Sequence, residues 1–133
     1  MRKFALDQTA LLLERFAAQL KHTSAVDDAD SIHDLRVSIR RLSRCLRTFS
    51  QFYPRSSWKP IRRRLSDLIH AAGEIRDRDI ALELLAEAGI SARAKIMQQL
   101  STERRGAAAN LQAELNRWNK RDYPHTWRSR LEL

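Results

Sequence analysis

The chain has 133 residues and carries 25 Lys and Arg against 16 Asp and Glu, for a formal net charge of +9. Its hydrophobic content of 43% is too high for a disordered basic tail, so we expect one folded domain over residues 1–133. A lone Cys45 excludes an internal disulfide, and the scattered His residues lack the spacing of a metal site. We therefore expect no metal, no cofactor, no signal peptide, no membrane span and a cytoplasmic location.

The chain is predicted to be all-α, because Gly and Pro are few and apolar residues recur three and four positions apart. Short connections between the helices favour an up-down helical bundle of about five helices. The predicted helices cover residues 4–21, 31–52, 57–72, 78–88 and 91–118. The fifth is one long C-terminal helix, and the tail of about 120–133 is expected to be irregular.

Capping and helix-breaking residues set the predicted boundaries. Ser31 forms a capping box with Asp34 three residues later, which predicts the start of the second helix. Gly73 is expected to close or bend the third helix. Asp77 is expected to cap the fourth helix and Gly89 to end it.

The most unusual stretch of the sequence is residues 35–66, which hold ten Arg and Lys and no Asp or Glu. A folded protein concentrates this much positive charge only where an anion offsets it, so the stretch predicts a polyanionic partner. At about 100° per residue, basic side chains fall within an arc of about 80° on the second helix, beside its apolar side. This ladder consists of His33, Arg36, Arg40, Arg44 and Arg47.

The spacing of the ladder indicates which anion would fit. Like charges four residues apart repel by a few tenths of a kcal/mol per pair, so the ladder lowers stability unless an anion lies across it. Successive turns rise by about 5.4 Å and Arg binds phosphate oxygens in a bidentate fork, which suits a phosphate chain. Lys59, Arg63 and His70 share one side of the third helix as a second basic surface, which either faces the first across a groove or is solvated.

Arg104 lies at the centre of the apolar sector of the fifth helix, where an Arg needs a partner. It either pairs with Asp77 or Asp79 or projects into the anion site. Those two acids alternate with Arg76 and Arg78, which makes them orienters of basic side chains rather than ligands of Mg²⁺. No nucleophile motif, phosphate-cradling glycine loop or paired carboxylates occur, so we do not expect an enzyme.

The sequence contains two motifs, the first on the second predicted helix and the other further along the chain. They are His33-x-x-Arg36-x-x-x-Arg40-Arg41 and Gly73-x-x-Arg76-Asp77-x-Asp79. Together they resemble the CHAD family, the conserved-histidine α-helical domains, over residues 31–88. The resemblance implies non-catalytic binding of inorganic polyphosphate in a basic channel, with some members found at polyphosphate granules. The ligands that it implies are His33, Arg36, Arg40, Arg41 and Arg76, to which the helical geometry adds Arg44, Arg47, Arg63 and Arg104.

Domains of this family contain two similar helical bundles, each of which supplies one basic wall of the channel. The present chain has the length for one bundle only. A single half leaves its basic ladder and part of its apolar surface exposed, so we expect a homodimer that completes the channel.

Two further functions use the same features. A nucleic-acid-binding protein would add base contacts, but Gln51 and the aromatic residues of the basic stretch cluster mostly at a helix end. In a histidine phosphotransfer domain His33 would accept the phosphoryl group, and one neighbouring cation would be expected rather than a ladder. A helical protein with an incidental basic face is the remaining alternative.

Overall fold

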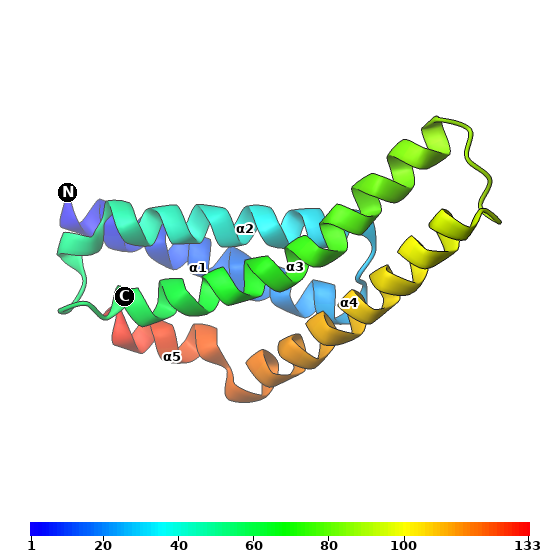
Figure 1. Cartoon of the computed structure of the whole chain (residues 1–133). Coiled ribbons are helices and arrows are strands. Elements are labelled where there is room, and N and C mark those ends of the chain that lie inside the picture. Colours follow the sequence, from blue (N-terminus) through cyan, green and yellow to red (C-terminus); the bar gives the residue numbers. More distant parts are fainter.

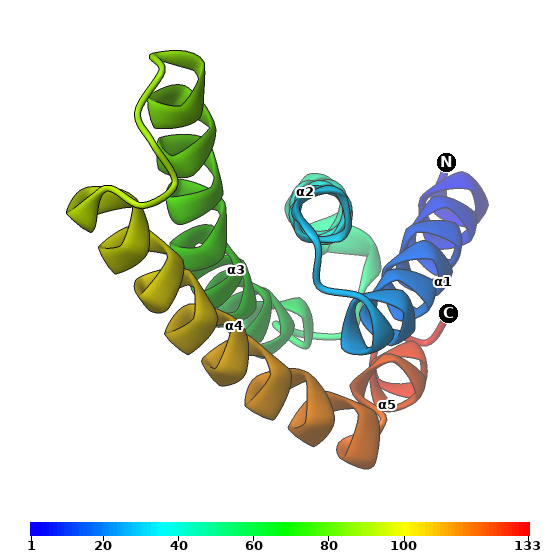
Figure 2. The same ribbon diagram turned by 90° about the vertical axis from the view of Figure 1, so that its right-hand side faces the viewer.

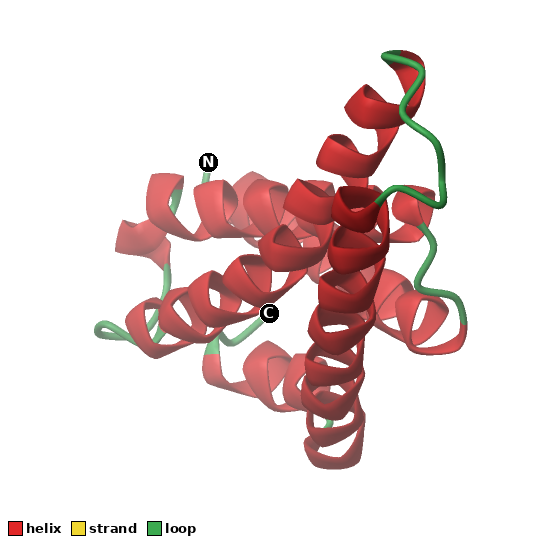
Figure 3. Ribbon diagram, turned by 45° about the vertical axis from the view of Figure 1, so that its right-hand side comes forward, coloured by secondary structure: helices red, strands yellow, loops and turns green.

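The computed structural model describes all residues from 1 to 133, and every regular element in it is helical. The helices are α1 (Arg2–Ala25), α2 (Ala29–Thr48), a short 3₁₀ turn η1 (Ser50–Phe52), α3 (Trp58–Glu87), α4 (Lys95–Arg121) and α5 (Tyr123–Arg130). The predicted all-α bundle of about five helices is therefore confirmed, and short loops join the helices (Figure 3). None of the helices is long and apolar enough to cross a membrane.

Helix α2 lies in the middle of one layer, with α1 on one side and the first half of α3 on the other (Figures 1 and 2). Helix α4 returns along α3 and meets α1, and α5 packs beside α1. The second half of α3 and the first half of α4 project beyond the α1–α2 pair as a hairpin (Figure 1). Both long sides of α2 are therefore seams with a neighbouring helix.

The predicted apolar side of α2 is confirmed as part of the core. Each of its large side chains is at most 1% exposed, and these are Ile32, Leu35, Ile39, Leu42 and Leu46. They pack in one cluster with residues of the other helices, among them Phe16 of α1, Leu65 of α3 and Leu115 of α4. Burial of this side leaves the basic side of α2 facing outward.

The start of α2 differs from the prediction, because Asp28 and not Ser31 caps the helix. The backbone N–H of Ser31 donates to Asp28 Oδ1 at 2.9 Å, and this bond holds the pKa of Asp28 below its usual value. Ser31 itself is buried and its hydroxyl bonds to His22 Nε2 at 3.0 Å. Asp and Ser both have side chains suited to an N-cap. Here Asp28 takes that position, while the hydroxyl of Ser31 contacts His22 of α1.

The predicted break between the third and fourth helices is wrong, because α3 continues through Gly73 and Asp77. A glycine inside a helix costs about 1 kcal/mol relative to Ala, which does not end a helix whose side is buried. Ala72 and Ile75 are both fully buried, so packing holds the helix together across the glycine. The predicted stop at Gly89 agrees with its left-handed backbone, φ 83°.

The end of the chain also differs from the prediction. The tail that was expected to be irregular contains the helix α5, so the long helix α4 is not the last one. Pro124 lies in the first turn of α5, where a helix tolerates it. Trp127 is 1% exposed and its ring packs edge-on against Trp118 of α4 with the ring centroids 5.3 Å apart. The ring of Trp127 also stacks on Phe16 of α1, with the ring centroids 6.2 Å apart, so packing against a residue distant in sequence helps to order the tail.

Candidate anion-binding site

The seam between α2 and α3 forms an open groove of about 250 Å³. Arginines of both helices line it, and its floor is aliphatic, with two serine hydroxyls between. The lining residues are Ile39, Arg40, Ser43, Arg44, Arg47, Arg62, Leu65, Ser66 and Ile69. Three members of the predicted ladder therefore do face α3 across one groove.

Arg62 is the residue of this groove that the sequence reasoning missed. Its Nε donates to Ser43 Oγ of α2 at 3.2 Å, so it bridges the two helices. Arg62, Ser66, Ile69, Gly73 and Arg76 recur at intervals of four, three, four and three along α3, which places them on one side of that helix. This spacing places Arg62 on the same side of a continuous α3 as Arg76, and the packing of α3 against α2 turns that side towards the groove.

The other end of the same seam holds Arg36 of α2 beside residues of α3. Burial lowers the pKa of Arg36, and the neighbouring cations Arg40 and Arg76 lower it further, while Asp77 acts in the opposite direction. The Nε of Arg36 is buried and donates to no group of the protein. The positive charges of α2 and α3 therefore reinforce one another here, and a bound anion would stabilise them.

Arg63 and Lys59 extend the basic surface over the outer side of α3. They line an open hollow of about 450 Å³ together with Trp58, Arg62 and Ser66. Because Arg62 and Ser66 line both hollows, this hollow continues the α2–α3 groove. His33 is exposed near the start of α2 and lies in line with Arg36 and Arg40 by helical spacing.

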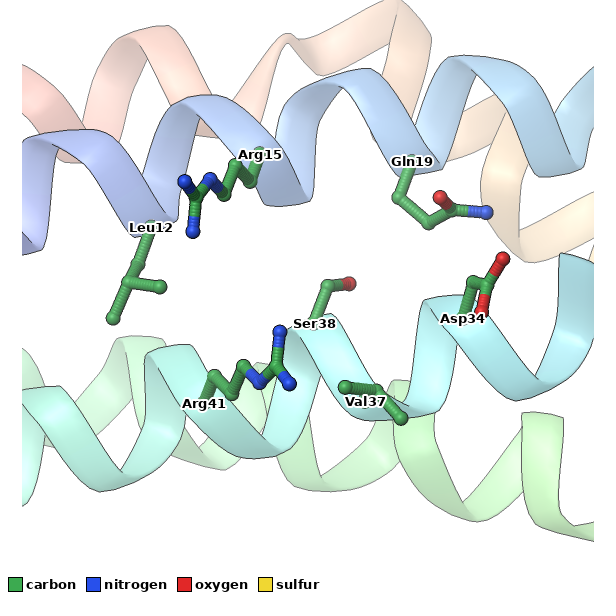
Figure 4. A pocket seen from close by; sticks show the side chains of 7 residues that line it. All are labelled: Leu12, Arg15, Gln19, Asp34, Val37, Ser38 and Arg41. Atoms are coloured by element: carbon green, nitrogen blue, oxygen red, sulfur yellow. The ribbon is translucent and has the colours of Figure 1, made fainter.

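Two of the predicted site residues do not join this surface. Arg41 points to the opposite seam, where it lines a pocket between α1 and α2 with Arg15 (Figure 4). Arg104 takes the first of its two predicted alternatives, because its Nε donates to Asp79 Oδ1 at 2.9 Å and its Nη2 to the Asp27 carbonyl at 2.8 Å. Arg104 thus ties α3 and α4 to the loop before α2.

We refer to the remaining basic residues on this side of the molecule as the basic face. They are His33, Arg36, Arg40, Arg44 and Arg47 of α2 with Lys59, Arg62, Arg63 and Arg76 of α3.

No residue of the basic face forms an ion pair. The arginines that do pair with carboxylates are Arg78, Arg104 and Arg117, and all of them lie outside it. The charge of the basic face is therefore not neutralised by ion pairs within the protein, and Asp77, which acts on Arg36, offsets it only in part. No group of three or more His, Cys, Asp or Glu side chains is arranged to hold a metal ion.

Comparison with known proteins places the chain in a family. No curated protein and no solved structure matches the chain. The model of the CHAD domain matches residues 9–132, which is nearly the whole chain and includes both seams of α2. The protein is therefore a member of the CHAD domain family.

Proposed function

We propose that the chain binds inorganic polyphosphate, or a polyanion of the same kind, on the basic face and does so without catalysis. The observation that carries this proposal is the absence of any ion pair among the nine residues of that face. Uncompensated arginines on two neighbouring helices lower stability, and an anion that spans both helices removes this cost. Membership of the CHAD family supports polyphosphate as that anion.

The dimensions of the basic face favour a chain of phosphates over a single one. From His33 to Arg47 the helix α2 rises by about 21 Å, at about 1.5 Å per residue. Arg62 and Arg76 face this row from α3, near its two ends. A flexible phosphate polymer can follow such a row, whereas one phosphate reaches a single turn of it.

The proposal is tested by titrating long-chain polyphosphate into the wild-type chain and the double variant Arg40→Gln/Arg44→Gln. Both arginines are exposed, so the variant should fold. We expect affinity to fall by about tenfold to a hundredfold, because each of the two lost contacts at these exposed positions contributes about 0.7–1.4 kcal/mol. Wild-type affinity should also fall steeply with added salt, since bound counterions are released from the polyanion.

The matched control is Arg105→Gln/Arg128→Gln, which removes the same charge from exposed positions outside the basic face. Its affinity should stay within about twofold of wild type, because distant surface charges are screened. Equal losses in the two double variants would show attraction by net charge alone and would contradict a site on the basic face.

Competition separates this function from nucleic-acid binding, which uses the same charges. The groove offers arginines and two serines, Ser43 and Ser66, but no Asn or Gln for base contacts, and the hollow that continues it adds one aromatic ring, that of Trp58. Duplex DNA or RNA should therefore displace polyphosphate poorly at equal phosphate concentration. Displacement with equal strength would favour the nucleic-acid function.

We further propose that a second copy of the chain supplies the opposite wall of the site. The α3–α4 hairpin carries large apolar side chains that are exposed to between 38% and 60%, namely Ile80, Leu84, Ile90 and Ile96. Ile80 and Leu84 follow Arg76 at intervals of four on α3, so this apolar strip continues directly from the basic face. A copy that covers the strip would bring its own charges beside that face.

A further inference from the structure

A second pocket lies between α1 and α2, on the opposite side of α2 from most of the basic face. It has a volume of about 200 Å³, and residues of both helices line it (Figure 4). They are Leu12, Arg15, Gln19, Asp34, Val37, Ser38 and Arg41. Five of these seven side chains are polar or charged, so the pocket presents charges and hydrogen-bonding groups rather than an apolar surface.

One end of the pocket holds two cations. Arg15 of α1 and Arg41 of α2 approach it from opposite sides, and their guanidinium groups lie towards the same end (Figure 4). Neither arginine forms an ion pair or a hydrogen bond with another group of the protein. Two like charges that converge on a hollow form a site for an anion with at least two acceptor oxygens.

The other end of the pocket holds the carboxylate of Asp34 and the amide of Gln19. Asp34 forms no ion pair, and its carboxylate lies near the side chain of Gln19 (Figure 4). The amide nitrogen of Gln19 donates to Thr23 Oγ1 at 3.2 Å and to the Ser31 carbonyl at 3.4 Å. These bonds use the donors of the amide and leave its Oε1 to accept from a ligand.

The middle of the pocket adds one more acceptor. The hydroxyl of Ser38 donates to the Leu35 carbonyl at 2.8 Å, so its lone pairs remain for a donor in the pocket. The pocket is thus dipolar, with donors at the end of Arg15 and Arg41 and acceptors at the end of Asp34. Helical spacing separates the two ends, because Asp34 and Arg41 are about 10 Å apart along α2.

We propose that this pocket binds a small phosphomonoester that carries an ammonium group. A phosphomonoester has close to two negative charges at neutral pH, which match the two guanidinium groups. An ammonium group matches the single charge of Asp34 and donates to Gln19 Oε1 and Ser38 Oγ. Polyphosphate has no donor for the acceptor end, and the phosphodiester of a lipid headgroup carries only one negative charge, so both fit less well.

The proposal is tested by NMR titration of the uniformly ¹⁵N-labelled chain with phosphoethanolamine and with ethyl phosphate, which lacks the ammonium group. We expect saturable shifts of the Arg15 and Arg41 Nε signals and of the Ser38 amide. Phosphoethanolamine should bind about tenfold more tightly than ethyl phosphate, which corresponds to one charge-assisted hydrogen bond. Glycerophosphoethanolamine, a diester with the same ammonium group, should bind more weakly than phosphoethanolamine and so distinguishes a free monoester from a lipid headgroup.

Two single variants separate the ends of the pocket. Arg15→Gln should weaken both monoesters by about tenfold, because each loses one charged contact. Asp34→Asn should bring phosphoethanolamine to the affinity of ethyl phosphate. Both side chains are exposed, and unchanged amide spectra elsewhere in the chain would show that the fold is intact.

The result is independent of the function proposed for the basic face. Arg40→Gln/Arg44→Gln should retain the affinity for phosphoethanolamine, and Arg15→Gln should retain the affinity for polyphosphate. Equal binding of the two monoesters in the wild-type chain would overturn the proposed ligand. Chemical-shift changes confined to the basic face on addition of phosphoethanolamine would overturn the proposed site. The site would also be overturned if polyphosphate shifted the Arg15 and Ser38 signals with the same affinity that it has for the basic face.

Discussion

At the scale of the residue, what distinguishes the arginines of this chain is the partner of each side chain. Arg40 and Arg44 are exposed in a groove and have no acid beside them. Arg104 is 21% exposed and is held by Asp79, whose side chain is 11% exposed, and by the carbonyl of Asp27. The first two are available to an outside anion, and Arg104 is already satisfied within the fold.

This difference predicts the behaviour of Arg104→Gln. The substitution leaves Asp79 largely buried without its cation, so we expect the free energy of unfolding to fall by about 2 kcal/mol. Urea unfolding followed by circular dichroism measures the change, with Arg105→Gln as the exposed neighbouring control. Polyphosphate affinity of the folded variant should remain within about twofold of wild type. A large loss of affinity without a loss of stability would place Arg104 in the binding site instead.

The periodicity of α2 was enough to identify its ladder, because residues on one side of a helix are set by spacing alone. It was not enough for Arg62 or Arg41. Arg62 enters the groove because α3 turns that side towards Ser43, and Arg41 leaves it because α1 packs on the other side of α2. Neither rotation can be read from the residues of one helix.

At the scale of the element, the continuity of α3 aligns the second wall of the groove. Arg62 and Arg76 lie on one side of the helix only because no break at Gly73 changes the rotation between them. Two separate helices would leave the direction of Arg76 undetermined. The single helix therefore places cations near both ends of the ladder on α2.

Glycine substitutions test this continuity. A Cβ at Gly73 would meet no atom within 4 Å, so Gly73→Ala should raise the free energy of unfolding by about 1 kcal/mol. Gly89→Ala should instead lower it by about 1 kcal/mol, because Gly89 has a φ of 83° that Ala adopts with strain. Thermal unfolding of the two variants measures both effects. Destabilisation by Gly73→Ala would indicate a bend at this position.

The tail shows why local signals can mislead about an element. Pro124 and the mixed composition after it favour irregular structure by propensity. The tail is nevertheless helical, because Trp127 and Leu131 each become 99% buried against other parts of the bundle. Burial of two large apolar side chains outweighs the weak local preference, at about 1.5–3 kcal/mol for each.

At the scale of the whole molecule, the α3–α4 hairpin is the part that the bundle does not cover. It projects past α1 and α2 (Figure 1) and exposes 60% of Leu84 and 46% of Ile96. Ile80 and Leu84 lie one turn apart on α3, and neighbouring exposed apolar groups are typical of surfaces that meet another protein. Its position beside Arg76 connects this surface to the basic face.

A homodimer through the hairpin should therefore have twice the chain mass in sedimentation equilibrium. Leu84→Glu should shift the population towards the monomer, because it places a charge in the apolar contact. The matched control Leu11→Glu alters a partly exposed leucine of α1 and should leave the mass unchanged. A wild-type chain that is monomeric at all concentrations, with and without polyphosphate, would contradict the dimer.

The order of residues alone settles the class of fold and the charged side of α2. Both follow from the 3.6-residue period of the helix, which is a local property of the backbone. The packing of the helices decides the rest, namely the groove shared by Arg40 and Arg62, the pocket of Arg15 and Arg41, and the ion pair of Arg104. Each of these depends on how two helices rotate against one another, and that rotation is set by burial of the common core rather than by either helix on its own.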